Sequence, residues 1–95
     1  MISGKTKTGF EFTIPKERFN DMEVIDLLRD MQRAEEEDDG GAKMLFAVSD
    51  LALLLLGKDG KKKLYNHLRT ESGQVPIDAV VAEVMDVFNS ANAGN

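Results

Sequence analysis

The residues best able to bind a metal ion form an acidic run near the middle of the chain. Five consecutive acids, Glu35 to Asp39, precede Gly40 and Gly41. Counted from Glu35, Gly40 stands at position 6 of a calcium-binding EF-hand loop, but position 12 is Phe46, where a bidentate glutamate is required. The run therefore predicts a solvated loop, and we expect no metal site.

The only histidine, His67, is the first candidate for catalysis. Nucleophilic catalysis would need it beside a hydroxyl and an orienting acid, and Ser49 with Asp50 could serve only if the fold brings them together. The chain has no HExxH, CxxC or GxSxG motif. Gly4-Lys5-Thr6 matches the end of a phosphate-binding loop but lacks its earlier glycine and preceding strand. We expect no catalytic residue, no cofactor and no enzyme.

Four lysines form the only concentrated positive charge, at Lys58, Lys61, Lys62 and Lys63. They are typical of a solvated helix face, and the alternative is a small patch that binds an acidic partner. No aromatic residues are interleaved with them, and the net charge of the 95 residues is −5. An acidic protein repels the phosphate backbone, so we expect no nucleic-acid partner.

The element that must organise the fold is the stretch from Ala42 to Leu56, in which only Lys43, Ser49 and Asp50 are polar. At 100° per residue it is a helix that is apolar nearly all round, with its main stripe at Leu45, Val48, Leu51, Ala52 and Leu55. It is shorter than the ~20 apolar residues that a bilayer requires, so we expect no membrane span.

Apolar residues outside this stripe are the predicted partner-binding residues. They are Phe46, Leu53, Leu54 and Leu56. Two short strands and three other helices must cover them, and any that stay uncovered favour binding of a protein partner or a second subunit. Leu54 is expected to be the most exposed, because it projects about 110° from the centre of the stripe. A homo-oligomer is therefore expected.

The N-terminal segment predicts a β-hairpin over residues 2–14. Phe10, Phe12 and Ile14 alternate with polar residues, so they share one face, and Gly9 suits the turn. A helix over about 21–34 follows, with Asn20 as its N-cap and Glu23 completing a capping box.

Two further helices are expected after the central one, which Gly57 ends. They span about 60–70 and 76–91, the second starting at Pro76. The buried face of the 76–91 helix is expected to consist of Ile77, Val80, Val81, Val84, Met85 and Phe88. Its solvent-facing side is expected to carry Asp78, Glu83, Asp86 and Asn89. The fold class is α+β, mainly α: one domain over residues 1–91, with a hairpin, about four helices and a frayed end at 92–95.

Composition agrees with a small globular protein, at 42% hydrophobic and 31% charged residues. Cysteine is absent, which excludes a disulfide framework and thiolate metal sites. The first residues lack the apolar core of a signal peptide, so we expect a cytoplasmic protein.

Three stretches together resemble a known family. They are TKTGFEFTIPKERFNDMEVIDLL, FAVSDLALLLLG and KKLYNHLRTESGQVPIDAVVAEVMDVF. In order they are a short hairpin running into an acid-capped helix, a leucine-rich segment, and a short helix followed by a Gly-Gln-Val-Pro break and a terminal amphipathic helix. This overall pattern resembles the small tail assembly chaperones of long-tailed phages and prophages.

The resemblance implies a mainly helical protein of the host cytoplasm that is absent from the finished virion. Such a protein coats the tape measure protein and helps recruit tail-tube subunits, and a longer frameshifted product is common in the family. The resemblance assigns no binding residues. Two alternatives stay open: a small phage regulatory or DNA-associated protein that uses Lys58 and Lys61 to Lys63, and a self-sufficient helical oligomerisation module.

Overall fold

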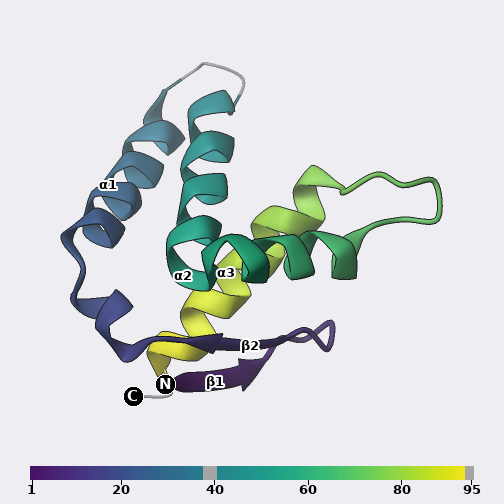
Figure 1. The fold of residues 1–95 in the computed structure, drawn as a ribbon. Helices are drawn as coiled ribbons and strands as arrows, with labels where there is room; N and C mark the ends of the chain where they lie inside the picture. The colour runs from purple at the N-terminus through teal and green to yellow at the C-terminus, as the bar shows by residue number, and fades with distance from the viewer. Residues whose placement is uncertain (38–40, 94–95) are drawn as a thin grey trace.

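A computed structural model describes residues 1–37 and 41–93, and in that part of the chain an antiparallel hairpin packs on three α-helices (Figure 1). The elements in order are β1 (Ile2–Lys5), β2 (Glu11–Ile14), a 3-10 helix η1 (Lys16–Asn20), α1 (Met22–Glu36), α2 (Ala42–Leu68) and α3 (Ile77–Ala93). The mainly helical class with an N-terminal hairpin is confirmed. The prediction of about four helices is wrong by one.

The hairpin forms as the apolar alternation predicts. Ile2 pairs with Ile14 and Gly4 pairs with Phe12, while the turn between the strands uses Gly9 at φ 93°. A Cβ on Gly4 would lie 2.5 Å from the Phe12 ring, so only glycine allows that ring to lie across β1. Phe10, Phe12 and Ile14 are all buried, which confirms the predicted face.

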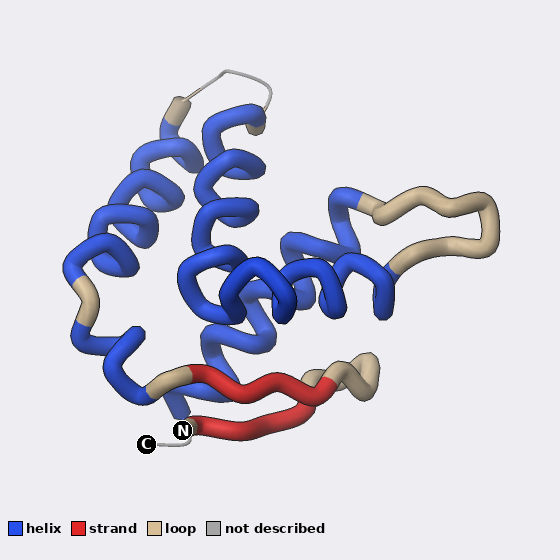
Figure 2. The backbone as a smooth tube through the Cα atoms, in the orientation of Figure 1, coloured by secondary structure: helices blue, strands red, loops and turns tan. Residues whose placement is uncertain are grey.

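The helices stack so that α2 lies at the centre of the molecule. It contacts α1, α3 and β2, and α3 also contacts β1. Figure 2 shows the hairpin lying across the lower end of the helices, with the last turns of α3 beside β1. The largest fully buried side chains come from every layer except α1: Ile14, Val48, Leu51, Leu55, Leu64, Val84 and Val87.

The start of α1 differs from its prediction by one residue. Asp21 is the N-cap, and its carboxylate accepts a hydrogen bond from the Glu23 backbone N–H at 2.9 Å. Asn20, the predicted cap, belongs to η1. Glu23 therefore stands at the second helical position instead of the third, and the predicted capping box does not form.

The central helix and its successor, predicted separately, form the single element α2 with a bend at Gly57. Gly57 has φ 75° and ψ 174°, while the residues on either side stay helical. The prediction that Gly57 leaves the helical conformation is correct, but the chain resumes its helix at once instead of forming a loop. Nζ of Lys61 donates to Oγ of Ser49 at 2.7 Å across the bend, which joins the two halves.

Gly57→Ala is expected to lower the free energy of unfolding by about 2 kcal/mol, because this φ/ψ region is open essentially only to glycine. A Cβ at Gly57 would meet no atom within 4 Å, so the loss reports the backbone alone. Urea unfolding measures it, with Lys58→Ala as the control at an ordinary helical position. Equal stability of the two variants would show that the bend carries no strain for an L-residue.

The exposed face of α3 also departs from its prediction. Ile77, expected in the core, is 59% exposed, and Glu83, expected in water, is 3% exposed. The helix continues through Asn92 to Ala93, so the expected fraying does not begin at 92. The predicted loop over 35–41 is wrong at Glu35 and Glu36, because α1 continues to Glu36. Its residues 38–40, and residues 94–95 of the predicted frayed end, lie outside the described residues.

Candidate functional site

A groove runs along the surface between α1 and the first half of α2. Its two hollows share Leu27 and Asp50, and they hold about 280 and 350 Å³. Its apolar lining comes from both helices: Leu27, Ala34, Phe46, Ala47, Leu53 and Leu54. We call this surface the α1–α2 groove.

The four predicted partner-binding residues divide into two pairs. Phe46 is 69% exposed and Leu53 is 45% exposed, and both line the groove. Leu54 and Leu56 are partly buried and pack against the core. The prediction that Leu54 is the most exposed member is wrong, because α1 lies on the side of α2 to which Leu54 projects, and Phe46 takes that place.

Charged side chains border the groove, and acids predominate. They are Glu23, Asp26, Asp30, Glu37 and Asp50, against Arg33 and Lys43. Lys43 forms an ion pair with Glu37, and Arg29 forms one with Asp26 at 3.6 Å. The end near Glu23 and Leu53 has three carboxylates and no basic side chain in its lining. A partner with positive charge beside apolar groups would match this end.

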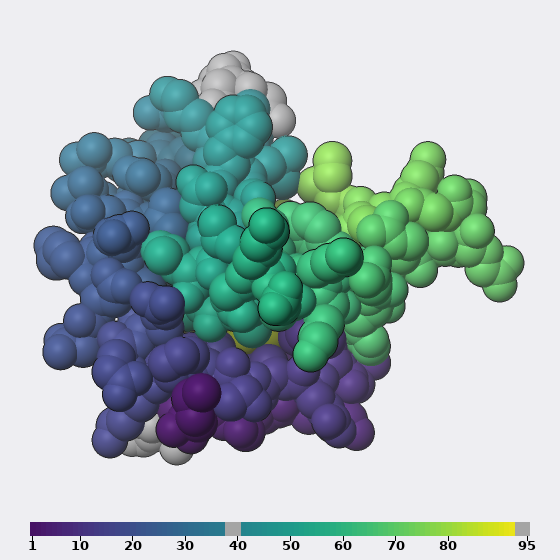
Figure 3. Space-filling view, viewed as in Figure 1, coloured from purple at the N-terminus to yellow at the C-terminus, as the bar shows by residue number. Residues whose placement is uncertain are grey.

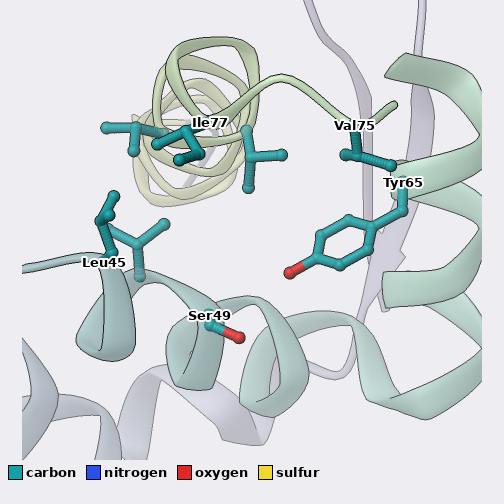
Figure 4. Close-up of a pocket in the computed structure, with 8 residues that line it drawn as sticks. Leu45, Ser49, Tyr65, Val75 and Ile77 are labelled. Atoms are coloured by element: carbon teal, nitrogen blue, oxygen red, sulfur yellow. The ribbon is translucent and has the colours of Figure 1, made fainter. Parts of the chain in front are cut away.

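A separate apolar cavity lies inside the bend of α2 (Figure 4). It holds about 200 Å³, and its walls include Leu45 and Ser49 from the first half of α2 and Tyr65 from the second half. Val75, from the segment before α3, and Ile77, the first residue of α3, complete the labelled walls. Pockets for small-molecule ligands commonly measure 300–1,000 Å³. This cavity is therefore suited to an apolar side chain and is too small for a typical cofactor.

The predicted lysine cluster lies on the second half of α2. Lys58, Lys61 and Lys62 line one hollow together with Leu53, Tyr65 and Arg69, which we call the basic hollow. Asp59 also lines it. Lys61 is committed to Ser49, and its Nζ lies 5.6 Å from the centre of the Tyr65 ring. Lys63 is exposed and does not line this hollow.

Four polar side chains form a network between the hairpin turn, α2 and α3, and sequence analysis missed it. The hydroxyls of Thr6 and Thr8 donate to the same carboxylate oxygen of Glu83, at 2.6 and 2.7 Å. The Thr8 hydroxyl donates its single proton to Glu83, so its oxygen accepts a hydrogen bond from Nε2 of His67 at 2.9 Å. We call Thr6, Thr8, His67 and Glu83 the turn network. Nothing local in the sequence indicates it, because the threonines and Glu83 are more than 70 residues apart.

His67 is hydrogen-bonded within the turn network and not to Ser49, its candidate catalytic partner. Its ring packs 5.5 Å from the Phe10 ring, and its Nε2 bonds to Thr8. Ser49 instead accepts from Lys61. In residues 1–37 and 41–93, no three His, Asp or Glu side chains are grouped to hold a metal ion. In the same ranges no helix is both long enough and apolar enough to cross a membrane.

Comparisons with protein-family models, with curated proteins and with solved structures give no match for this chain. The resemblance to tail assembly chaperones therefore stays a prediction, and the geometry of the α1–α2 groove is the main guide to function.

Proposed function

We propose that this protein binds a helical segment of another protein in the α1–α2 groove. The exposure of Phe46 and Leu53 on the lining of a hollowed surface supports this most directly. Large apolar side chains held in water cost free energy, and grouping them in a groove lets a partner recover it.

The spacing of the two exposed residues favours a helix as the bound segment. Phe46 and Leu53 are seven residues apart, so they lie on one side of α2 and about 10 Å apart along its axis. An amphipathic helix lying along the groove offers its own apolar side chains at the same seven-residue interval. The acids at the border then favour lysine or arginine on the flanks of that helix.

A tail assembly chaperone would use such a groove in a definite way. Its partner, the tape measure protein, is long and helical. A groove that contacts only the apolar stripe of a helix and the charges beside it can bind many similar segments of that partner. We propose the tape measure protein as the partner and the tail-tube protein as a second partner recruited to the complex.

Phe46→Asp is expected to weaken binding of a tape measure segment at least about thirtyfold, the loss typical of a central aromatic contact. The variant should stay folded, because the Phe46 side chain is exposed and contributes little to the hydrophobic core. Isothermal titration calorimetry with helical segments of a phage tape measure protein measures the affinity, and circular dichroism checks the fold.

Ile77→Asp is the matched control, because Ile77 is also largely exposed but lies on α3 outside the groove. It should bind like the wild type. If both variants bind normally, the groove is not the binding surface. If both lose binding equally, the effect comes from added negative charge and not from the lost ring.

A further inference from the structure

Leu53 occupies a singular position on the surface of the described chain. It is the one residue that lines both the basic hollow and the lower end of the α1–α2 groove. That lower end, which we call the acidic hollow, is lined by Glu23, Asp26, Leu27, Asp50, Leu53 and Leu54. Figure 3 shows α1, the first half of α2 and the second half of α2 side by side across one face. An exposed leucine therefore separates two surfaces of opposite charge.

The two hollows carry opposite charges, and most of these charged side chains can pair with a partner. Three carboxylates and no base line the acidic hollow, and four bases with the single acid Asp59 line the basic hollow. Within residues 1–37 and 41–93, Lys58 and Lys62 form no ion pair, and neither do Glu23 and Asp50. Asp26 has only the exposed partner Arg29, and such pairs contribute little.

We propose that a second copy of this chain covers Leu53 in a two-fold symmetric pair. In a two-fold interface every contact occurs twice, with the roles of the copies exchanged. An axis near Leu53 brings the two Leu53 side chains together. It also sets the acidic hollow of each copy against the basic hollow of the other. The chain thus carries both halves of its own complementary surface.

The size of the molecule is compatible with such a pair. A standard interface buries about 800 Å² on each partner, which is roughly one-eighth of the 6259 Å² surface of this chain. The apolar centre is small, formed by Leu53 with Leu54 and Tyr65 on its two sides. Charge must therefore contribute much of the specificity, and the pair should dissociate readily in salt.

The pair would also regulate the groove, a consequence that rests on the proposed function. It covers Leu53 and the acidic hollow, which form one end of the α1–α2 groove. A bound helix and a second copy then exclude each other. The pair would keep this apolar surface from water until a helical partner displaces it.

Sedimentation velocity on the purified chain alone tests the pair. The wild type should be a dimer near 20 mM salt, and its dissociation constant should rise about tenfold or more near 500 mM salt. Leu53→Asp should be monomeric under both conditions, while Ile77→Asp should behave as the wild type. Species that grow beyond a dimer would overturn the two-fold form, and a wild type that is monomeric at low salt would overturn the pair altogether.

Charge reversal provides the sharper test. Lys58→Glu/Lys62→Glu makes both hollows acidic, and Glu23→Lys/Asp26→Lys makes both basic, so each double variant should be monomeric by itself. Mixed in equal amounts, they should form a heterodimer, because both contacts across the axis again join opposite charges. Failure of the mixture to associate, with both variants folded, would overturn the assignment of these surfaces.

These measurements contain no other protein, so they are independent of the proposed function. A wild-type chain that binds tape measure segments but does not dimerise would overturn the second-copy proposal alone. A normal pair with no binding of any helical segment would leave it standing and would overturn the proposed function.

Discussion

Leu51→Ala is expected to lower the free energy of unfolding by about 3 kcal/mol, because truncating a fully buried leucine leaves a cavity. Leu51 has no exposed surface and lies in one cluster with Ile14, Leu55 and Val84. A domain of this length has roughly 5–15 kcal/mol of stability, so the loss is a large share of the total. Thermal unfolding followed by circular dichroism should show a melting temperature about 15 °C lower.

Leu53→Ala is the matched control, since it makes the same change two residues away on the same helix. Leu53 is 45% exposed, and its truncation should cost under about 1 kcal/mol. The difference between the two variants therefore measures which face of α2 is core. Equal losses would mean that α2 presents a different face to the hairpin and α3.

Local periodicity was sufficient to predict the hairpin and the buried stripe of α2. Phe12 and Ile14 alternate with polar neighbours, and a strand with such alternation has only one face that it can bury. Val48, Leu51 and Leu55 are likewise buried as their spacing predicts. In both cases the pattern of polar and apolar residues determines the orientation.

The same reasoning could not decide between Phe46 and Leu54. The first half of α2 is apolar nearly all round, so its sequence contains little information about which side each neighbouring helix covers. The position of α1 decides it, and that position depends on the entry through η1 and the cap at Asp21. The candidate binding surface is thus a property of how the helices pack.

The bend at Gly57 shows a different limit. The sequence indicates a residue with positive φ, and the same glycine can end a helix or redirect one. Contacts of the two helical segments on either side of the glycine select the second outcome, including the hydrogen bond from Lys61 to Ser49 across the bend and the burial of Leu64. The cavity at the bend and the basic hollow both depend on the redirected course of α2 after Gly57.

Helical periodicity predicts Glu83 on the solvent-facing side of α3, together with Asp78, Asp86 and Asn89. The hairpin turn covers it instead and supplies the two hydroxyls that make its burial tolerable. The backbone N–H of Lys7 also donates to Asp86 at 2.9 Å, so the turn is held to α3 at two successive levels of the helix.

Glu83→Ala is expected to lower the free energy of unfolding by about 3 kcal/mol, because it removes two hydrogen bonds to a charged group. Thr6 is 6% exposed, so its hydroxyl would lose its carboxylate acceptor at a buried position. The hairpin turn should then loosen from α3. Backbone amides of residues 6–10 should exchange hydrogen faster in the variant than in the wild type, and the increase should be larger than for the amides of α2. Urea unfolding and hydrogen exchange measure the two effects.

Glu83→Gln separates the hydrogen bonds from the charge. Its amide oxygen can still accept from both threonine hydroxyls, so the loss should be about 1 kcal/mol. Glu71→Ala, at an exposed glutamate in the segment between α2 and α3, should change stability by less than about 0.5 kcal/mol. If the glutamine variant is as unstable as the alanine variant, acceptance from Thr6 and Thr8 does not hold the turn, and the carboxylate must stabilise it through its charge. An alanine variant as stable as Glu71→Ala would show that the turn network contributes nothing to the fold.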